Sequence, residues 1–270
     1  MHLPGMRCLR AYTEEVGTMS TPYVTVSFSG GKDSTAMLLH MIELGEHIDE
    51  VITADTGMEF PAVYEHIAKV RKIVEAAGIK YTELRADHGF EWHLMEIPPT
   101  EARPRKGMGW PGIQIRWCTK FLKTKLIKDY LAEHPDAIHC VGLAADEADR
   151  RERENNKTQR HPLAEWGWTE ADAMRYCRAR GFDWGGLYDR FRRVSCWCCP
   201  LQPMSHLRTL YDEFPELWAR LEDMDARIRA DTSCNDRPFK GNYTVADLSR
   251  RFAQEAKARR EQRSLEDWFV

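Results

Sequence analysis

A glycine pair that follows an apolar run is the part of this chain best suited to bind a phosphate. Residues 23–28 are mostly β-branched or aromatic, and they lead into Ser29-Gly30-Gly31-Lys32-Asp33-Ser34. A strand, a glycine turn and a helix start bring backbone N–H groups together, and the helix dipole favours an anion there. We predict a phosphate cradle lined by Ser27 and residues 29–34, with Lys32, Asp33 and Ser34 as the catalytic residues. An ordinary glycine turn before a helix is the alternative.

The spacing of the eight cysteines indicates a metal site. Cys196 and Cys199 have the C-x-x-C spacing with which two thiolates hold one metal ion or cluster. Cys118 lies near the expected start of a helix at Thr119, where the dipole stabilises a thiolate. Such thiols suit a metal cluster or a zinc ion. The predicted ligands are Cys118, Cys196 and Cys199; Cys198 or Cys234 supplies a fourth, or the fourth position stays open.

Two other segments carry groups that suit a nucleotide. Asp55-Thr56-Gly57 follows an apolar run, at the edge of a parallel sheet where ligands bind, and Asp55 can hold a ribose hydroxyl or a metal. Arg150 and Arg151 lie in a charged stretch, and arginine binds phosphate or sulfate with two hydrogen bonds. Arg153 is weighed evenly between this role and an exposed ion pair. A helix-capping turn and a solvated loop are the alternatives for the two segments.

In this order, these motifs resemble the phosphoadenylyl-sulfate (PAPS) and adenylyl-sulfate reductases, which belong to the PP-loop ATP pyrophosphatase superfamily. The resemblance covers residues 23–202 and implies an adenine nucleotide, either ATP or an adenylyl sulfate, together with Mg²⁺. It also implies an iron–sulfur cluster, expected to be 4Fe-4S, at the cysteines, with zinc as the alternative. It is carried by Ser29 to Ser34, Asp55-Thr56-Gly57 with Phe60-Pro61, Trp117-Cys118, residues 142–147 with Arg150 and Arg151, Pro162-Leu163 with Trp166, and residues 195–199.

The chain departs from this family pattern at two places. Trp117 stands where the family has the first cysteine of a pair, and no Glu-Cys-Gly-His segment is found; Cys234 is the late thiol. We therefore expect ATP-dependent adenylation of an acceptor coupled to sulfur transfer. The alternatives are reduction of an adenylyl sulfate and a non-catalytic, nucleotide-binding component of a DNA or RNA modification or defence complex. The sulfur acceptor can be a nucleic acid or a small molecule, and a partner protein can donate the sulfur.

Short apolar runs alternate with helical patterns, which predicts an α/β fold. We expect a PP-loop (adenine nucleotide alpha hydrolase-like) parallel sheet of about five strands with helices on both faces, plus a helical C-terminal part that bears cysteines. The expected strands are 23–28, 50–54, 81–85 and 137–142, and residues 143–161 are expected to be a charged loop. The predicted division is an N-terminal extension (1–20), a nucleotide-binding domain (21–165) and the helical part (166–270).

Composition excludes several classes of protein. The net charge of −3 does not suit a generally nucleic-acid-binding chain, and no apolar run of 18 residues suggests a membrane span. The start of the chain has no secretory pattern, so we expect a cytoplasmic protein. Eight Lys and Arg and no acidic residue lie between Arg103 and Lys128. We interpret this insert, with Trp110 and Trp117, as a mobile lid over the nucleotide, or otherwise as a surface that docks and stacks nucleic acid.

Overall fold

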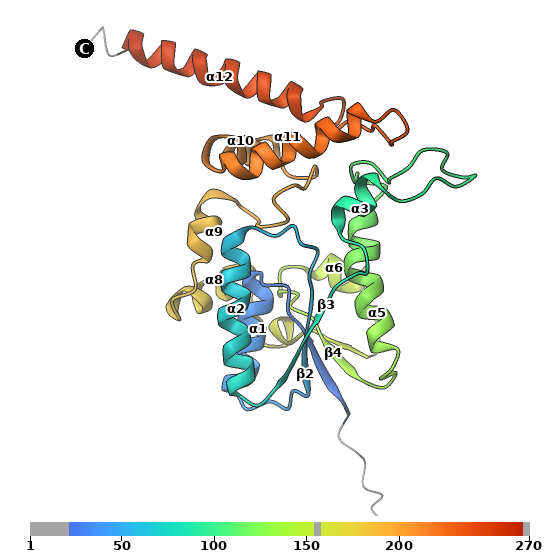
Figure 1. Ribbon diagram of the computed structural model, residues 1–270. Helices are drawn as coiled ribbons and strands as arrows, with labels where there is room; N and C mark the ends of the chain where they lie inside the picture. The colour runs from blue at the N-terminus through green and yellow to red at the C-terminus, as the bar shows by residue number, and fades with distance from the viewer. Residues whose placement is uncertain (1–21, 154–157, 267–270) are drawn as a thin grey trace, which may run out of the picture.

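A parallel five-stranded sheet is the centre of the computed structural model, which describes residues 22–153 and 158–266 (Figure 1). The strand order is β3-β2-β1-β4-β5. The strands are β1 (Val24–Ser27), β2 (Glu50–Ala54), β3 (Lys80–Leu84), β4 (Ile138–Cys140) and β5 (Gln159–Arg160). Because the chain steps outward from β1 to β3 and then returns to β4 on the other side of β1, a switch point lies between β1 and β4, where ligands of open α/β sheets bind.

Helices cover both faces of the sheet, as predicted. The connections that step outward from β1 are α1 (Lys32–Glu43) and α2 (Pro61–Ala76), and they lie on one side in Figure 1. The return connection ends in α5 (Lys125–Leu131), which lies on the other side, as right-handed crossovers require. The predicted α/β fold class, a parallel sheet of five strands with helices on both faces, is confirmed.

The stretch expected to be a charged loop contains three short elements. They are α6 (Ala148–Arg153), β5 and α7 (Pro162–Glu165). The charged pattern hides β5 because this strand is only two residues long and pairs at the edge of the sheet, His139 with Gln159 and Cys140 with Arg160. Prediction of a loop over 143–161 was therefore wrong in part.

The helix predicted to begin at Thr119 begins two residues earlier. It comprises α4 (Trp117–Thr119), the π-helical turn η1 (Lys120–Thr124) and α5, with Arg116 at the N-cap and no side chain bonded to the cap. The Thr119 N-cap was wrong, because Thr119 already has helical backbone angles. Cys118 thus lies in the first turn of this helical run.

The C-terminal helices stack beyond the carboxyl ends of the strands, next to α3 (Phe90–Met95) (Figure 1). They follow α8 (Glu170–Ala179), η2 (Trp184–Gly186) and α9 (Leu187–Arg190), and they are α10 (Met204–Glu213), α11 (Pro215–Ala230) and α12 (Val245–Glu266). Pro215 starts a new helix, as expected. Since α8 packs on α1, the predicted boundary at residue 165 runs between contacting helices, and the division stays a prediction. The predicted N-terminal extension lies outside the described residues.

The basic insert is a packed part of the molecule. Trp110 and Trp117 are 0% and 2% exposed, and their indole N–H groups donate to Asp225 Oδ1 at 2.8 Å and to the Gly109 carbonyl at 2.9 Å. Lys106 pairs with Asp231 at 2.6 Å, and Arg105 pairs with Asp236. The interpretation as a base-stacking tryptophan surface was wrong, because both indoles are buried. Trp110, Arg105 and Lys106 join the insert to the C-terminal part, and the lid stays a prediction. No helix of the described residues is long and apolar enough to cross a membrane.

Candidate functional site

The predicted phosphate cradle lies at the carboxyl end of β1, where the chain turns into α1. Gly30 adopts φ +75°, and a Cβ there would lie 2.7 Å from Ile67 Cγ1, so both the turn and the packing require glycine. Ser34 Oγ bonds to the Gly31 carbonyl at 3.1 Å and lies 3.1 Å from Ser29 Oγ. The predicted residues 29–34 are therefore brought together as one turn, while Ser27 ends β1 below it.

Carboxylates surround the only lysine of this turn. Lys32 Nζ lies 2.8 Å from Asp33 Oδ2 and 2.6 Å from Glu170 Oε2, at the start of α8. Burial lowers the pKa of Lys32, but the charge of Asp33 and the bonds to both acids outweigh it, so the pKa is raised. Burial raises the pKa of Asp33 against the opposing effect of Lys32. Lys32 is thus a permanent cation for which a phosphate must compete with two acids.

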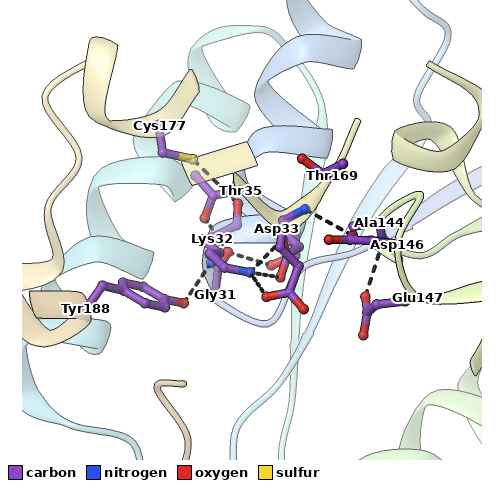
Figure 2. Close-up of polar contacts among 12 residues, drawn as sticks. Gly31, Lys32, Asp33, Thr35, Ala144, Asp146, Glu147, Thr169, Cys177 and Tyr188 are labelled. Carbon is purple, nitrogen blue, oxygen red and sulfur yellow. Dashed lines mark hydrogen bonds and ion pairs between the residues drawn. The ribbon is translucent and has the colours of Figure 1, made fainter. Parts of the chain in front are cut away.

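Three side chains that the sequence did not single out form hydrogen bonds with the backbone of this turn. The backbone N–H of Lys32 donates to the Tyr188 hydroxyl at 3.0 Å, and the Cys177 thiol donates to the Lys32 carbonyl at 3.4 Å (Figure 2). Trp184 Nε1–H donates to the Gly30 carbonyl at 2.8 Å, although its own φ of 52° is unusual for a bulky residue. The Trp184-Gly185-Gly186 sequence could have indicated this contact, since two adjacent glycines predict an unusual backbone turn.

Another close approach fixes the cradle from β4. A Cβ at Gly142 would lie 2.9 Å from both the N and the Cα of Ser34. We expect Gly142→Ala to lower the free energy of unfolding by about 1–3 kcal/mol, because backbone atoms cannot yield as a side chain does. It should also weaken ATP binding, measured by calorimetry. Gly112→Ala is the control, since its Cβ would only touch Arg237 Nη1 at 3.6 Å; equal effects of the two variants would contradict this account.

The segment Asp55-Thr56-Gly57 follows β2 and reaches from the cradle side to the cysteines. Asp55 Oδ1 accepts from the Tyr64 hydroxyl and from the Gly57 N–H, both at 2.8 Å, and Asp55 Oδ2 pairs with Arg85 at 2.9 Å. Its carboxylate is thus already partnered. Thr56 Oγ1 lies 3.8 Å from Cys196 Sγ. The segment, called here the shared wall, thus follows the strand paired with β1 and reaches Cys196.

The four predicted metal ligands gather in one place, called here the cysteine site: Cys118, Cys196, Cys198 and Cys199. Each thiol is close enough for its charge to act on the pKa of another, since Cys118 and Cys196 act on Cys198 and Cys118 acts on Cys199. A turn closed by the Cys199 N–H and the Cys196 carbonyl at 3.1 Å presents the C-x-x-C pair. The sequence thus identified side chains that meet in space.

Two charged residues outside the prediction lie in this site. The Cys196 thiol donates to Glu59 Oε1 at 3.4 Å, and Lys123 Nζ lies 3.1 Å from the same oxygen. Burial raises the pKa of Cys196, Cys198 and Cys199. Burial lowers the pKa of Lys123, but the charges of Cys196 and Glu59 outweigh it and raise that pKa. Lys123 therefore supplies a fixed positive charge where thiolates would form.

The loop after the cysteines is held by two further residues. Gln202 Nε2 donates to the carbonyls of Cys196 at 3.1 Å and Trp197 at 3.0 Å, and Lys240 Nζ donates to the Pro200 carbonyl at 2.8 Å. Nothing in the sequence around Gln202 or Lys240 predicted that these residues bond to the cysteine loop. Both hold the backbone of the cysteine loop, Gln202 from within the same loop and Lys240 from a segment distant in the chain.

The donor chemistry of the cysteine site suits a soft metal or an iron–sulfur cluster. However, no group of three or more His, Cys, Asp and Glu side chains in residues 22–153 and 158–266 is arranged to hold a metal ion. The placed side chains therefore do not form a ligand set, and the ligand roles stay a prediction. No reaction step is derived through a metal.

The other described thiols lie elsewhere. Cys140 and Cys177 are fully buried, in β4 and α8. Cys234 is 2% exposed and donates to the Met95 carbonyl at 3.4 Å, and burial raises its pKa. An exposed, reactive thiolate is not found at Cys234.

The predicted anion-binding arginines lie in α6. Arg150 Nη1 lies 3.2 Å from Glu147 Oε1, and Arg151 donates to the carbonyls of Ala144 and Ala145. Glu147 acts on the pKa of Asp33, so this segment is near the cradle. Figure 2 shows Glu147 and Asp146 beside it. Nucleotide binding by the two arginines stays a prediction, and the side chain of Arg153 lies outside the described residues.

Comparison with known proteins gives matches in sequence and in structure. Two uncharacterised proteins of Methanocaldococcus jannaschii are 29% identical over 212 residues (74% of this chain, 41% of the relative) and 25% identical over 218 residues (77% and 49%). The chain thus spans less than half the length of these relatives. The U34-tRNA thiolase NcsA from Methanococcus maripaludis, solved with its 4Fe-4S cluster, aligns over 87% of this chain and 73% of its own, with a TM-score of 0.43 and 12% identity.

The family assignment comes from the part of the chain that builds the cradle, the shared wall and the cysteine site. Residues 23–202 match the phosphoadenosine phosphosulfate reductase domain. This range runs from β1 to the turn after the C-x-x-C pair, so it contains every predicted site residue. The chain belongs to the phosphoadenosine phosphosulfate reductase domain family.

Proposed function

We propose that this protein binds ATP at residues 29–34 and uses it to adenylate an acceptor, which then receives sulfur at the cysteine site. The observation that carries the proposal is the shared wall, because Thr56 Oγ1 lies 3.8 Å from Cys196 Sγ while its segment follows the strand next to the cradle. Family membership supports chemistry on an adenine nucleotide and on sulfur. The arrangement favours a nucleotide and a sulfur centre that face one acceptor.

The chemistry separates into two displacements. An acceptor oxygen attacks the α-phosphorus of ATP, the bond to the β-phosphate breaks, and pyrophosphate leaves with part of its charge balanced by Lys32; Mg²⁺ bound with ATP would supply further positive charge. A hydrosulfide then attacks the activated carbon, forming a C–S bond as the C–O bond breaks and AMP leaves. Lys123 stabilises the anionic sulfur before attack. Adenylation makes a poor oxygen leaving group a good one, which is why an α–β cleavage suits sulfur transfer.

A metal, iron–sulfur or zinc, is proposed at the cysteine site on the chemistry of its thiols. We expect purification without oxygen to retain metal in the wild type, and Cys196→Ser with Cys199→Ser to lose it, as measured by iron, sulfide and zinc counts. Cys140→Ser and Cys177→Ser are the matched controls, since these thiols are buried elsewhere. Full metal retention in the double variant would refute the site.

The reaction is tested by product analysis with ATP and Mg²⁺. Pyrophosphate should form only when an acceptor is present, and AMP should form only when a sulfide source is present as well. Reduction of phosphoadenylyl sulfate to sulfite by a thiol is the second candidate, which the family name favours. The burial of Cys234 argues against it as the nucleophile, so we expect no robust release of sulfite. Sulfite production that disappears in Cys234→Ser would favour the reductase.

A further inference from the structure

A short exposed turn next to the cysteine site presents apolar side chains to solvent. The Gly112 N–H donates to the Ile115 carbonyl at 3.1 Å, and the Ile115 N–H returns a bond to the Gly112 carbonyl at 3.2 Å. At the tip of this turn Ile113 is 79% exposed, and Ile115 is 38% exposed. Two backbone bonds thus hold a turn that presents Ile113, and in part Ile115, to solvent.

Three cations surround this turn. Arg116 and Lys120 are exposed and four residues apart at the helix start, hence on one face, and the Lys120 N–H donates to the Arg116 carbonyl at 3.0 Å. Arg237 reaches the turn from the C-terminal part, with Nη1 3.6 Å from where a Cβ of Gly112 would lie. We call Arg116, Lys120 and Arg237 the basic rim.

Within the described residues, no carboxylate pairs with any member of the basic rim. By contrast, the neighbouring Arg105 and Lys106 pair with Asp236 and Asp231. Acidic residues are absent from positions 102–128, so local sequence offers no partner either. The rim therefore keeps its three charges available to an external anion, although the whole chain is negative.

The basic rim opens onto the predicted sulfur centre. Cys118 lies between Arg116 and Lys120 in the chain. Arg116 is also near enough to Cys199 for its charge to act on that thiol. A polyanion seated on the rim would therefore lie beside the segment that carries Cys118, close to the cysteine site.

We propose that the acceptor is a single-stranded stretch of nucleic acid, whose phosphates bind Arg116, Lys120 and Arg237 and whose bases contact Ile113 and Ile115. This inference rests on the proposed function, since it names the acceptor of that reaction. Single strands expose both repeated phosphates and apolar base faces, and the surface offers separate cations and apolar side chains for the two. An acidic polypeptide would supply charge without flat apolar faces, so nucleic acid is favoured.

The test measures binding of fluorescent single strands of about 12 nucleotides, one of RNA and one of DNA, by anisotropy with the full chain. Arg116→Ala, Lys120→Ala and Arg237→Ala are combined in one variant. We expect the affinity of this variant for the strands to fall at least about tenfold. The slope of log K against log salt should become shallower by about 2, because each of the three lost phosphate contacts contributes about 0.7. Polyglutamate is added as a competing anionic polypeptide and should displace neither strand.

The matched control replaces Lys69 and Lys72 of α2 by alanine, because these two are also exposed and pair with no carboxylate among the described residues. The control should bind as the wild type does. Equal binding by both variants, or displacement by polyglutamate, would overturn the inference. ATP calorimetry separates the two proposals. The rim variant should bind ATP with the affinity of the wild type. If the wild type does not bind ATP, the proposed function is refuted, whereas the nucleic-acid surface is still judged by the anisotropy measurement. The strand that binds tighter identifies the polymer.

Discussion

Lys32→Ala should weaken ATP binding by about 10- to 150-fold, because a charge-assisted hydrogen bond contributes about 1.5–3 kcal/mol. Lys32 Nζ is the cation of the cradle, within 2.8 Å of Asp33 and 2.6 Å of Glu170. Its removal leaves two carboxylates that repel the phosphates. Calorimetry with ATP and Mg²⁺ measures the affinity, and thermal unfolding shows whether the variant is folded.

Glu170→Gln is the counterpart, since it removes one of the acids that compete with phosphate for Lys32. The Glu170 side chain is half exposed, so its ion pair is weak, and we expect ATP affinity to rise by up to about fivefold. If Lys32→Ala left the affinity unchanged in a folded protein, the assignment of residues 29–34 as the nucleotide cradle would be wrong. If Glu170→Gln left the ATP affinity unchanged, only the competition between Glu170 and phosphate for Lys32 would be rejected.

Asp225→Ala is expected to lower the free energy of unfolding by about 3–5 kcal/mol, because it leaves buried partners without their acceptor. Asp225 is 2% exposed and accepts from Trp110 Nε1–H at 2.8 Å, from the Val245 N–H at 3.0 Å and from Arg229 at 3.0 Å. It joins the insert, α11 and the start of α12 at one carboxylate. Urea unfolding, monitored by tryptophan fluorescence, measures the loss.

Asp223→Ala is the matched control on the same helix. Its carboxylate is exposed and lies 3.5 Å from Arg227, a pair that should contribute less than about 1 kcal/mol. A loss at Asp225 no larger than that at Asp223 would show that the insert is not held to the C-terminal helices in this way.

The sequence predicted the strand–turn–helix of the cradle because its information is local. An apolar β-branched run, two glycines and an amphipathic helix each fix backbone within a few residues, and residues 29–34 lie together as expected. The same holds for the C-x-x-C turn. By contrast, β5 was missed because a two-residue edge strand has no pattern of its own and forms only by pairing with β4.

The insert shows the opposite case, in which a local pattern misled. Basic residues near tryptophans favour an exposed, binding segment when only neighbours in the chain are considered. In the tertiary structure, Trp110 bonds to Asp225 and Lys106 pairs with Asp231, and both partners are more than 100 residues away in the chain. Trp110 can therefore be buried, and Lys106 has an ion-pair partner. Arg116 and Lys120 of this stretch, joined by distant Arg237, keep the exposed or partly exposed cationic character that the pattern indicated.

By itself, then, the sequence determined the fold class, the position of the cradle and which thiols belong together. The tertiary structure decided what surrounds them. Glu59 and Lys123 at Cys196, Glu170 at Lys32 and Tyr188 beneath the turn come from separate elements, and no spacing rule relates them. Electrostatic and hydrogen-bond partners depend on distance in space, whereas motifs record distance along the chain, and the two agree only within a turn or a helix.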